Sequence, residues 1–383
     1  MRIPSTHLLT MAYIAKFGLP LNEFINSTPN DLIYVNGIKT RRRLYEQNPD
    51  LLHFPVAPHE KGKSADALAL MAIRPLIDFI QKHPAKHWPI VIKEYDRYSM
   101  EHFLRNNPIS TSLSAAAVDK IKVMSGFEGF PELSFLEIFR DFILFEPPTR
   151  FYEVTGGFDL LPQSFAPSLN EHIRFHHKVD RISQKGQQIV FSGVDTATRT
   201  PFELTGDIAI ITIPFTVLQF IDVEPSNLFS FDKWKAIHQL HYVSSTKIAL
   251  QFSRRFWEEA GLYGGQVISD LPLRFSYFPS HGFDQSGGVV LASYTWEDDA
   301  LPWVCLSHDE NIWQALRQLA VLFGEQVYKT FVTGVTHHWL LQPHAGGGFA
   351  LFKPFQETEL SAALTSMEGP IIFAGEHTSP AYH

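Results

Sequence analysis

The chain has 383 residues, 45% of them hydrophobic, which is enough for two or three domains with substantial cores. Its 32 basic and 40 acidic side chains give a net charge of −8, which argues against a nucleic-acid partner. The single cysteine, Cys305, excludes a disulfide framework and a metal site built from several thiolates. No apolar run reaches the roughly 20 residues that span a bilayer. Composition therefore predicts a soluble α/β protein, and it leaves the compartment, cytoplasmic or secreted, open.

The first 50 residues predict a helix followed by a hairpin. Apolar residues recur at helical spacing over 8–17, and Gly18 is a suitable helix stop. Residues 31–38 have the pattern strand, turn, strand around Asn36-Gly37, a dipeptide typical of tight hairpin turns.

Residues 63–145 predict helices without an intervening strand. Pro75 should kink or divide the first helix, because proline has no N–H to donate and its ring meets the preceding turn. Ser99, Ser114 and Ser134 each precede a further amphipathic stretch, and serine is a favoured N-cap residue.

After residue 148 the pattern changes to mixed strands and helices. We expect a strand at 149–155, a helix at 158–169 and an antiparallel hairpin over 173–191. Residues 202–213 predict a strand whose segment 208–211 is apolar on both faces, as in a buried parallel strand. The remaining expected elements are strands at 246–252, 273–278, 289–295 and 371–374 and a helix at 311–323.

Several common catalytic motifs are absent from the sequence. It contains no Gly-x-Gly-x-x-Gly, no phosphate-binding Gly-x-x-x-x-Gly-Lys, no His-Glu-x-x-His and no Gly-x-Ser-x-Gly. The pairs His176-His177 and His337-His338 would point to opposite faces of a strand, so we expect no metal site there. Cys305 is interpreted as a buried small apolar residue rather than a nucleophile.

Several short strings follow one another along the whole chain in a characteristic order. They are Met1-Arg2-Ile3-Pro4, the segment 13–24, Glu60-x-Gly62-Lys63-Ser64-Ala65, His241-Tyr242-x-x-Ser245-Thr246-Lys247-Ile248, Phe256-Trp257-Glu258, Asp270-Leu271-Pro272-x-Arg274-Phe275 and Phe373-Ala374-Gly375-Glu376-His377-Thr378-Ser379. Each string alone is weak evidence. Together they resemble the flavin amine oxidases, and the L-amino-acid oxidase branch in particular.

This resemblance implies an α/β fold with α+β elements: a Rossmann-like cofactor domain, a substrate domain with a mixed sheet, and a helical insert. The expected segments are 1–50 and 229–345 in the substrate domain, 51–148 in the helical domain, and 149–228 and 346–383 in the cofactor domain. The family's N-terminal βαβ unit, whose glycine-rich turn holds the FAD pyrophosphate, has no counterpart here, and neither does the family's C-terminal end. We therefore expect the sequence to be a fragment.

The resemblance assigns substrate and catalytic roles to three residues. Arg2 corresponds to the arginine that pairs with the substrate carboxylate, although it could instead be a frayed terminal residue. Tyr294 corresponds to a second carboxylate contact, with an ordinary core tyrosine as the alternative. Lys247 corresponds to the lysine that acts through a water at flavin N5, where O2 is reduced, and the alternative is a strand-end lysine with a structural role.

Four further residues correspond to cofactor contacts. Gly375 and Glu376 follow a buried strand and resemble the pair that contacts the pyrophosphate and ribityl region of FAD. Val179 resembles the residue whose backbone pairs with adenine, and Trp339 an aromatic that lines the flavin ring or simply a core residue. Asp141 stands where venom-type enzymes carry a histidine, so substrate range and gating are uncertain.

We thus expect FAD-dependent oxidation of L-amino acids to 2-oxo acids, with release of ammonia and H2O2. The expected partners are an amino acid or amine substrate and O2, with no nucleic acid, no metal and no transmembrane segment; a homo-oligomer stays open. A monoamine or polyamine oxidase, a tryptophan monooxygenase and an inactive fragment are the alternatives. Arg2 distinguishes among them, because an amine without a carboxylate needs no such arginine.

Overall fold

The computed structural model describes residues 2–144 and 149–379, except for the side chains of Asp141, Phe142 and Leu144. Its largest sheet has seven strands in the order β16-β12-β15-β14-β13-β3-β4. These strands are β3 (Leu32–Val35), β4 (Ile38–Arg41), β12 (Ser245–Phe252), β13 (Gln266–Ser269), β14 (Phe275–Tyr277), β15 (Gly288–Trp296) and β16 (Phe331–His338). Helix α14 (His308–Phe323) packs on one face of β12, β15 and β16. A core of aromatic and aliphatic side chains, including the fully buried Trp257, fills the space between them.

The predicted hairpin and the first predicted helix are both confirmed. Strands β3 and β4 pair in an antiparallel register around Asn36 and Gly37, whose φ angles are 53° and 74°, as this turn type requires. Helix α1 (Leu8–Phe17) ends at Gly18 in the left-handed conformation.

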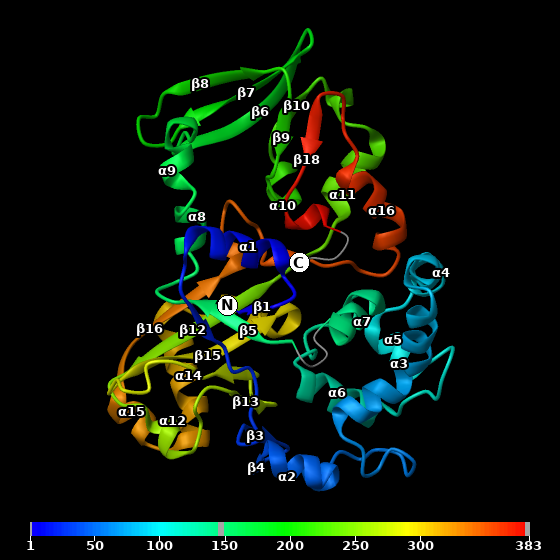
Figure 1. The fold of residues 1–383 in the computed structure, drawn as a ribbon, viewed down its shortest axis with the longest axis vertical. Helices are drawn as coiled ribbons and strands as arrows, with labels where there is room; N and C mark the ends of the chain where they lie inside the picture. The colour runs from blue at the N-terminus through cyan, green and yellow to red at the C-terminus, as the bar shows by residue number, and fades with distance from the viewer. Residues whose placement is uncertain (1, 145–148, 380–383) are drawn as a thin grey trace.

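Five main helices lie beside the seven-stranded sheet (Figure 1) and share a core with the face that is opposite α14. They are α3 (Ala65–Lys82), α4 (Pro84–Tyr95), α5 (Met100–Arg105), α6 (Ala115–Ser125) and α7 (Phe135–Leu144). The predicted caps at Ser99 and Ser114 are confirmed, because each hydroxyl accepts a hydrogen bond from the N–H three residues on. Of the described helices, none has the length and apolar character that crossing a membrane requires.

We expected Pro75 to kink or divide its helix; it does not divide it, since α3 continues through it from Ala65 to Lys82, and the kink stays a prediction. Proline leaves the carbonyl four residues earlier, that of Met71, without its helical donor. Ser110 Oγ donates a hydrogen bond to this carbonyl at 3.1 Å, and Asn107 Nδ2 donates to the next one, that of Ala72, at 3.0 Å. A neighbouring loop therefore replaces the bond that proline removes.

At the other end of the molecule (Figure 1), a four-stranded sheet has the order β10-β6-β7-β8, and β9 and β18 form a separate parallel pair. The strands are β6 (His177–Lys185), β7 (Gln188–Asp195), β8 (Pro201–Gly206), β9 (Ala209–Ile211), β10 (Asp222–Glu224) and β18 (Ile371–Phe373). Helices α10 (Phe215–Leu218), α11 (Phe231–Gln239) and α16 (Gln356–Thr365) share one core with β9 and β18.

Two sequence predictions for this region need correction. Strand β9 is parallel to β18 as expected, but it is covered on one face only, since Ile208 and Ile210 are 67% and 63% exposed. The predicted helix over 158–169 is two short helices, α8 (Leu160–Gln163) and α9 (Ala166–Leu169). The second begins with Pro167 at one of its first positions, where the missing N–H costs nothing.

Smaller elements link the two ends. Strands β1 (Ile3–Pro4), β5 (Phe151–Val154) and β2 (Leu21–Glu23) form a three-stranded sheet, and β11 (Tyr242–Val243) pairs with β17 (Phe349–Ala350). The remaining helices are α2 (Arg42–Gln47), α12 (Phe256–Glu259), α13 (Leu301–Val304) and α15 (Gln326–Thr330), with short 3-10 turns η1 (Pro49–Leu52), η2 (Asn170–His172), η3 (Ser226–Leu228), η4 (Glu297–Asp299), η5 (Trp339–Leu341) and η6 (Glu376–Thr378). The expected division into domains stays a prediction.

The helical segment also caps a helix at the opposite end of the sequence. Asp96 follows the last turn of α4, and its Oδ2 accepts hydrogen bonds from the N–H and the hydroxyl of Thr358 at 2.8 and 2.6 Å. Thr358 lies in the first turn of α16, whose own N-cap residue, Phe355, offers no side-chain acceptor. A residue from α4 thus satisfies backbone donors at the start of α16.

Candidate active site

Lys247 lies on β12, which is flanked by β16 and β15 near one edge of the seven-stranded sheet, with Tyr294 of β15 directly opposite it. Its Nζ is 4.6 Å from the centroid of the Tyr294 ring and 6.0 Å from that of Trp339. Within the described ranges, Nζ has no hydrogen-bond or ion-pair partner in protein. Because burial disfavours the ammonium form, the pKa of Lys247 falls to about 8. This lysine is therefore close to its titration point near neutral pH.

Arg2 lies beside the same tyrosine, although the two residues are far apart in sequence. Its guanidinium carbon is 5.3 Å from the ring centroid of Phe151 and 5.6 Å from that of Tyr277. Pairing of β1 with β5 holds the N-terminal segment here, since Pro4 lies opposite Phe151. Burial raises the pKa of Tyr294, and the nearby charge of Arg2 partly opposes that rise. Arg2, Tyr294 and Lys247 thus lie around one region lined by aromatic rings.

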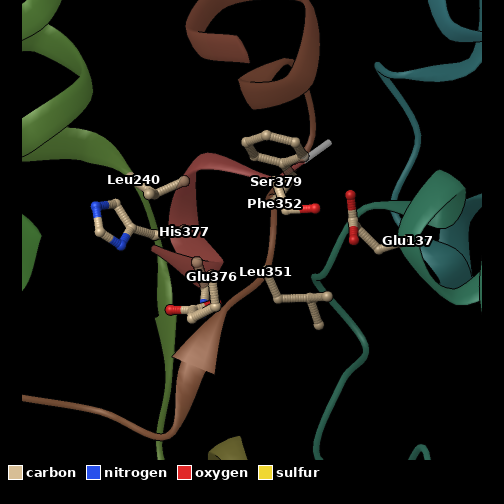
Figure 2. A pocket seen from close by; sticks show the side chains of 8 residues that line it. Glu137, Leu240, Leu351, Phe352, Glu376, His377 and Ser379 are labelled. Carbon is tan, nitrogen blue, oxygen red and sulfur yellow. The ribbon is translucent and has the colours of Figure 1, made fainter. Parts of the chain in front are cut away.

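Glu376 lies in the turn that follows β18, where its carboxylate accepts hydrogen bonds from the N–H of Ala350 at 3.2 and 3.3 Å. Burial raises the pKa of Glu376. The preceding Gly375 has a φ of 122°, and a Cβ there would lie 2.9 Å from the His377 ring, so only glycine fits. Figure 2 shows the side chains of Glu376 and His377 at this turn, with Glu137 of α7 on the other side of a narrow pocket.

The strands connect this turn to the lysine. Ala350 lies opposite Tyr242 in the β17–β11 pair, and β11 leads almost directly into β12, which carries Lys247. The structure therefore brings Arg2, Tyr294, Lys247 and Trp339 together and ties Glu376 to them through β11 and β17.

Two predicted residues stand apart from this group. Val179 lies on β6 opposite Gly193, next to an irregularity in the β6–β7 register, in the four-stranded sheet. Asp141 lies in α7, but its side chain is outside the described part of the structure. Its comparison with a histidine therefore stays a prediction.

Sequence reasoning missed the aromatic residues that hold Arg2. Phe151 and Tyr277 carry no reactive group, and nothing in their local sequence distinguishes them from core residues. Some of the short strings that resemble the family have a structural role instead. Glu60, which is fully buried, accepts hydrogen bonds from the N–H groups of Ala57 and Ser114, both at 2.7 Å. Such strings indicate the fold rather than the chemistry.

The prediction that Cys305 is buried is wrong, because the residue is exposed on the surface. It follows the short helix α13, where its thiol reaches only the carbonyl of Leu301 at 3.8 Å. In the residues that the structure covers, no three side chains of histidine, cysteine, aspartate or glutamate are grouped as metal ligands would be.

A family model described as "Flavin containing amine oxidoreductase" matches residues 1–383. The chain belongs to this family. The predicted membership of the flavin amine oxidases is therefore confirmed. As a flavin amine oxidoreductase it is an enzyme with FAD as its cofactor. Its substrates are a small molecule and O2.

Named relatives of this flavin amine oxidoreductase are similar over almost the whole chain. A protein of Bacillus subtilis (strain 168) named "Putative L-amino-acid oxidase YobN" is 44% identical over 380 residues, which cover 99% of this chain and 78% of the relative. The L-amino-acid oxidase of Siganus canaliculatus is 36% identical over 381 residues, covering 99% of this chain and 71% of that protein.

Solved structures confirm the fold. Cyclohexylamine oxidase from Brevibacterium oxydans IH-35A has a TM-score of 0.76 at 17% identity, covering 100% of this chain and 82% of its own. Putrescine oxidase bound to putrescine has a TM-score of 0.66 at 15% identity, covering 99% and 82%. The predicted amine oxidase fold, with mixed helices and sheets, is thereby confirmed.

The described residues fit a flavin at two places. The aromatic faces of Tyr294 and Trp339, with a lysine between them that lacks a protein partner, suit a flat ring system with polar edges. The carboxylate of Glu376, whose pKa is raised, lies beside a glycine that lets a ligand approach the backbone, and it suits a hydroxyl-bearing chain. No glycine-rich phosphate-binding turn occurs in the 383 residues.

Proposed function

We propose that this flavin amine oxidoreductase oxidises L-amino acids. The position of Arg2 carries the proposal. Its guanidinium carbon lies within 5.6 Å of the centroids of the Phe151 and Tyr277 rings, and its charge opposes the rise in the pKa of Tyr294. A guanidinium is the side chain best suited to bind a carboxylate, because its donors match the two oxygens. An amine without a carboxylate gives such a residue nothing to bind.

In this proposal Arg2 and the Tyr294 hydroxyl bind the substrate α-carboxylate. Both would donate hydrogen bonds to it, in a region where the rings of Phe151 and Tyr277 lie beside the guanidinium. Fixing the carboxylate fixes the direction of the bond between Cα and its hydrogen. The contribution of these residues is orientation.

Lys247 is proposed as the catalytic residue. Because burial brings its pKa to about 8, its amine can hold or release a proton near neutral pH at little cost. When bound, FAD would supply the redox chemistry, the two-electron oxidation of the amino acid to an imino acid coupled to reduction of O2 to H2O2, and water would then hydrolyse the imino acid to a 2-oxo acid and ammonia. The lysine holds charge and water at the place where oxygen is reduced.

Four residues are proposed to hold FAD. The Glu376 carboxylate and the backbone at Gly375 would bind the ribityl and pyrophosphate region, and Trp339 would pack against the ring system. Val179 would pair with adenine through its backbone. Glu376 is the best supported of these, since its pKa is raised and only one backbone N–H, that of Ala350, is bonded to its carboxylate in the described structure.

The experiment compares phenylalanine with phenethylamine as substrates of the protein and of Arg2→Ala, each assayed with FAD in excess. Loss of a buried charge pair costs about 2–5 kcal/mol, so kcat/KM for phenylalanine should fall by at least about 30-fold, with phenethylamine affected far less. Arg150→Ala is the control, because Arg150 is 62% exposed and pairs with Glu23 at the surface. Equal losses on both substrates would remove the amino-acid assignment and favour a monoamine oxidase.

A further inference from the structure

Three strands place His337, Lys247 and Tyr294 in one row across the seven-stranded sheet. Lys247 of β12 lies opposite Tyr294 on one side and opposite His337 of β16 on the other. Residues directly opposite each other in an antiparallel pair project from the same face. His337 therefore projects from the face that carries the candidate active site.

The neighbouring pair confirms which face this is. His338 lies opposite Thr246, and its Nδ1 is 2.9 Å from the Thr246 hydroxyl, while its Nε2 is 3.3 Å from Asn311 of α14. His338 thus faces α14 and has partners at both ring nitrogens. His337, one residue earlier, faces the other way, and its ring centroid lies 4.6 Å from that of Trp339.

His337 differs from its neighbour in having a buried nitrogen without a partner. Its Nε2 is shielded from solvent, and the described part of the chain offers it no hydrogen bond. Lys247 lies on the same face and is partly buried, and its Nζ has no hydrogen-bond partner among the described residues, where it lies close to the rings of Tyr294 and Trp339. A buried polar atom without a partner is rare and costs about 1–3 kcal/mol, so the unpartnered His337 nitrogen on the same face as this lysine points to a group that bonds to both.

We propose that His337 is a positioning residue for Lys247, and that a water molecule bound between His337 Nε2 and Lys247 Nζ holds the lysine in place. The proposal deepens the proposed function, since it rests on Lys247 being the catalytic lysine. The imidazole contributes an acceptor for that water, and the ring itself packs against Trp339. Substrate and FAD do not contact His337 in this arrangement.

The pairing has a consequence for the protonation of the lysine. A water that donates to His337 and accepts from Lys247 favours the charged amine, so its loss should lower the lysine pKa. The titratable groups that face Lys247 from adjacent strands are Tyr294 and His337, and His338 projects from the opposite face. No charged group in the described structure shifts the lysine pKa; only burial does.

The test measures Lys247 itself, in protein without flavin. An amine-selective acylating reagent is applied at pH 7, and modification of Lys247 is followed by peptide mass spectrometry. In His337→Phe, which keeps a ring against Trp339 but lacks the nitrogen, acylation should be about three- to tenfold faster, because more of the amine is neutral. His337→Gln, which keeps an acceptor, should stay within about twofold of the parent.

His338→Gln is the matched control, since it alters the adjacent histidine on the opposite face. Equal acceleration in the His338 variant would mean local loosening and would overturn the proposal, as would unchanged acylation in His337→Phe. Reoxidation of the reduced FAD-loaded protein should slow at least threefold in His337→Phe, with reduction by phenylalanine unchanged. If acylation of Lys247 is faster in His337→Phe but the parent protein oxidises no amino acid, the positioning role is supported and only the proposed function is lost.

Discussion

Arg274 donates a hydrogen bond of 2.6 Å to Glu128, and its other terminal nitrogen donates to Asp299 at 2.7 Å. One guanidinium therefore serves two carboxylates from different segments, and Glu128 Oε2 is buried without a partner in the described structure. Burial raises the pKa of Glu128 to about 7, and the attraction of Arg274 only partly opposes it. Protonation of Glu128 therefore makes the free energy of unfolding depend on pH.

We expect Glu128 to make the fold less stable as the pH rises. Because its folded pKa lies above the unfolded value of 4.5, its stabilising contribution is complete below pH 4.5 and is lost as the pH passes 7. The loss is on the order of 3 kcal/mol. In urea unfolding at pH 5 and pH 8, Glu128→Gln should reduce the difference between the two free energies of unfolding. Glu132→Gln, an exposed residue of the same loop, is the control, and identical behaviour of the two variants would contradict the prediction.

His377 should have the opposite pH dependence. Its ring is buried beside Phe215, and burial, with the charge of Lys233, lowers its pKa to about 4. The stabilising contribution is therefore complete above pH 6.5 and is lost as the pH falls through 4. His377→Phe should lessen acid destabilisation between pH 6.5 and 4, measured as the change in Tm of the flavin-free protein. The exposed His172→Phe serves as the comparison; an unchanged acid profile in the His377 variant would show that this residue does not set it.

The substitution Lys247→Met distinguishes a catalytic role of this lysine from a structural one. The substitution removes a buried ammonium whose pKa is lowered from 10.5 to about 8, so at pH 7 the free energy of unfolding should rise, by up to about 3 kcal/mol. Stopped-flow absorbance, after anaerobic reduction with an amino acid and mixing with oxygenated buffer, should show slower flavin reoxidation. Unchanged reduction and reoxidation would make Lys247 structural.

Lys120 offers a contrast for that measurement. It is also buried, but its Nζ donates to the carbonyls of Pro49 and Lys63, both at 2.8 Å. Lys120→Met leaves these carbonyls unpaired, so it should lower the free energy of unfolding by about 1–3 kcal/mol. A rise of similar size in both methionine variants would mean that the hydrogen bonds of Lys120 contribute nothing.

The 383-residue chain alone should bind FAD weakly. Its sequence has no glycine-rich turn to hold the pyrophosphate, and strand β9 exposes Ile208 and Ile210 on one face. Titration with FAD, followed by quenching of flavin fluorescence, should give less than one equivalent bound at micromolar concentrations. A stoichiometric yellow complex after purification would contradict this expectation.

Local signals predicted the local structure well. Asn36-Gly37 and Gly18 specify backbone conformations that few other residues adopt, so the hairpin and the helix end follow from the sequence. Pro75 does not end its helix, because Ser110, 35 positions away, supplies the hydrogen bond that replaces the one proline removes. The local sequence around Pro75 does not show this. The exposure of Ile210 could not be predicted from the local sequence either. A run of apolar residues gives the same pattern whether one face or both faces of the strand are covered.

The candidate site shows the same limit. The family resemblance gave Arg2, Lys247 and Tyr294 as separate positions, and the structure shows them together. Their proximity depends on the β12–β15 register, which shifts after Ile248, and on the pairing of β1 with β5. Neither register has a signal in composition or periodicity, since a shift of one residue changes which face each side chain occupies. For that reason the sequence shows His337 only as half of a histidine pair on a strand, and not as a neighbour of Lys247.

The bond between Asp96 and Thr358 limits how this enzyme could be recombined. The helical segment looks like a module that might be exchanged between relatives, yet it supplies the acceptor that starts α16, and α16 leads into β18 and the Glu376 turn. A transplanted segment without an acidic residue at this position would leave the N–H and the hydroxyl of Thr358, at the start of α16, without this acceptor. Chimaeras should therefore exchange Asp96 and Thr358 together, as a single inherited unit.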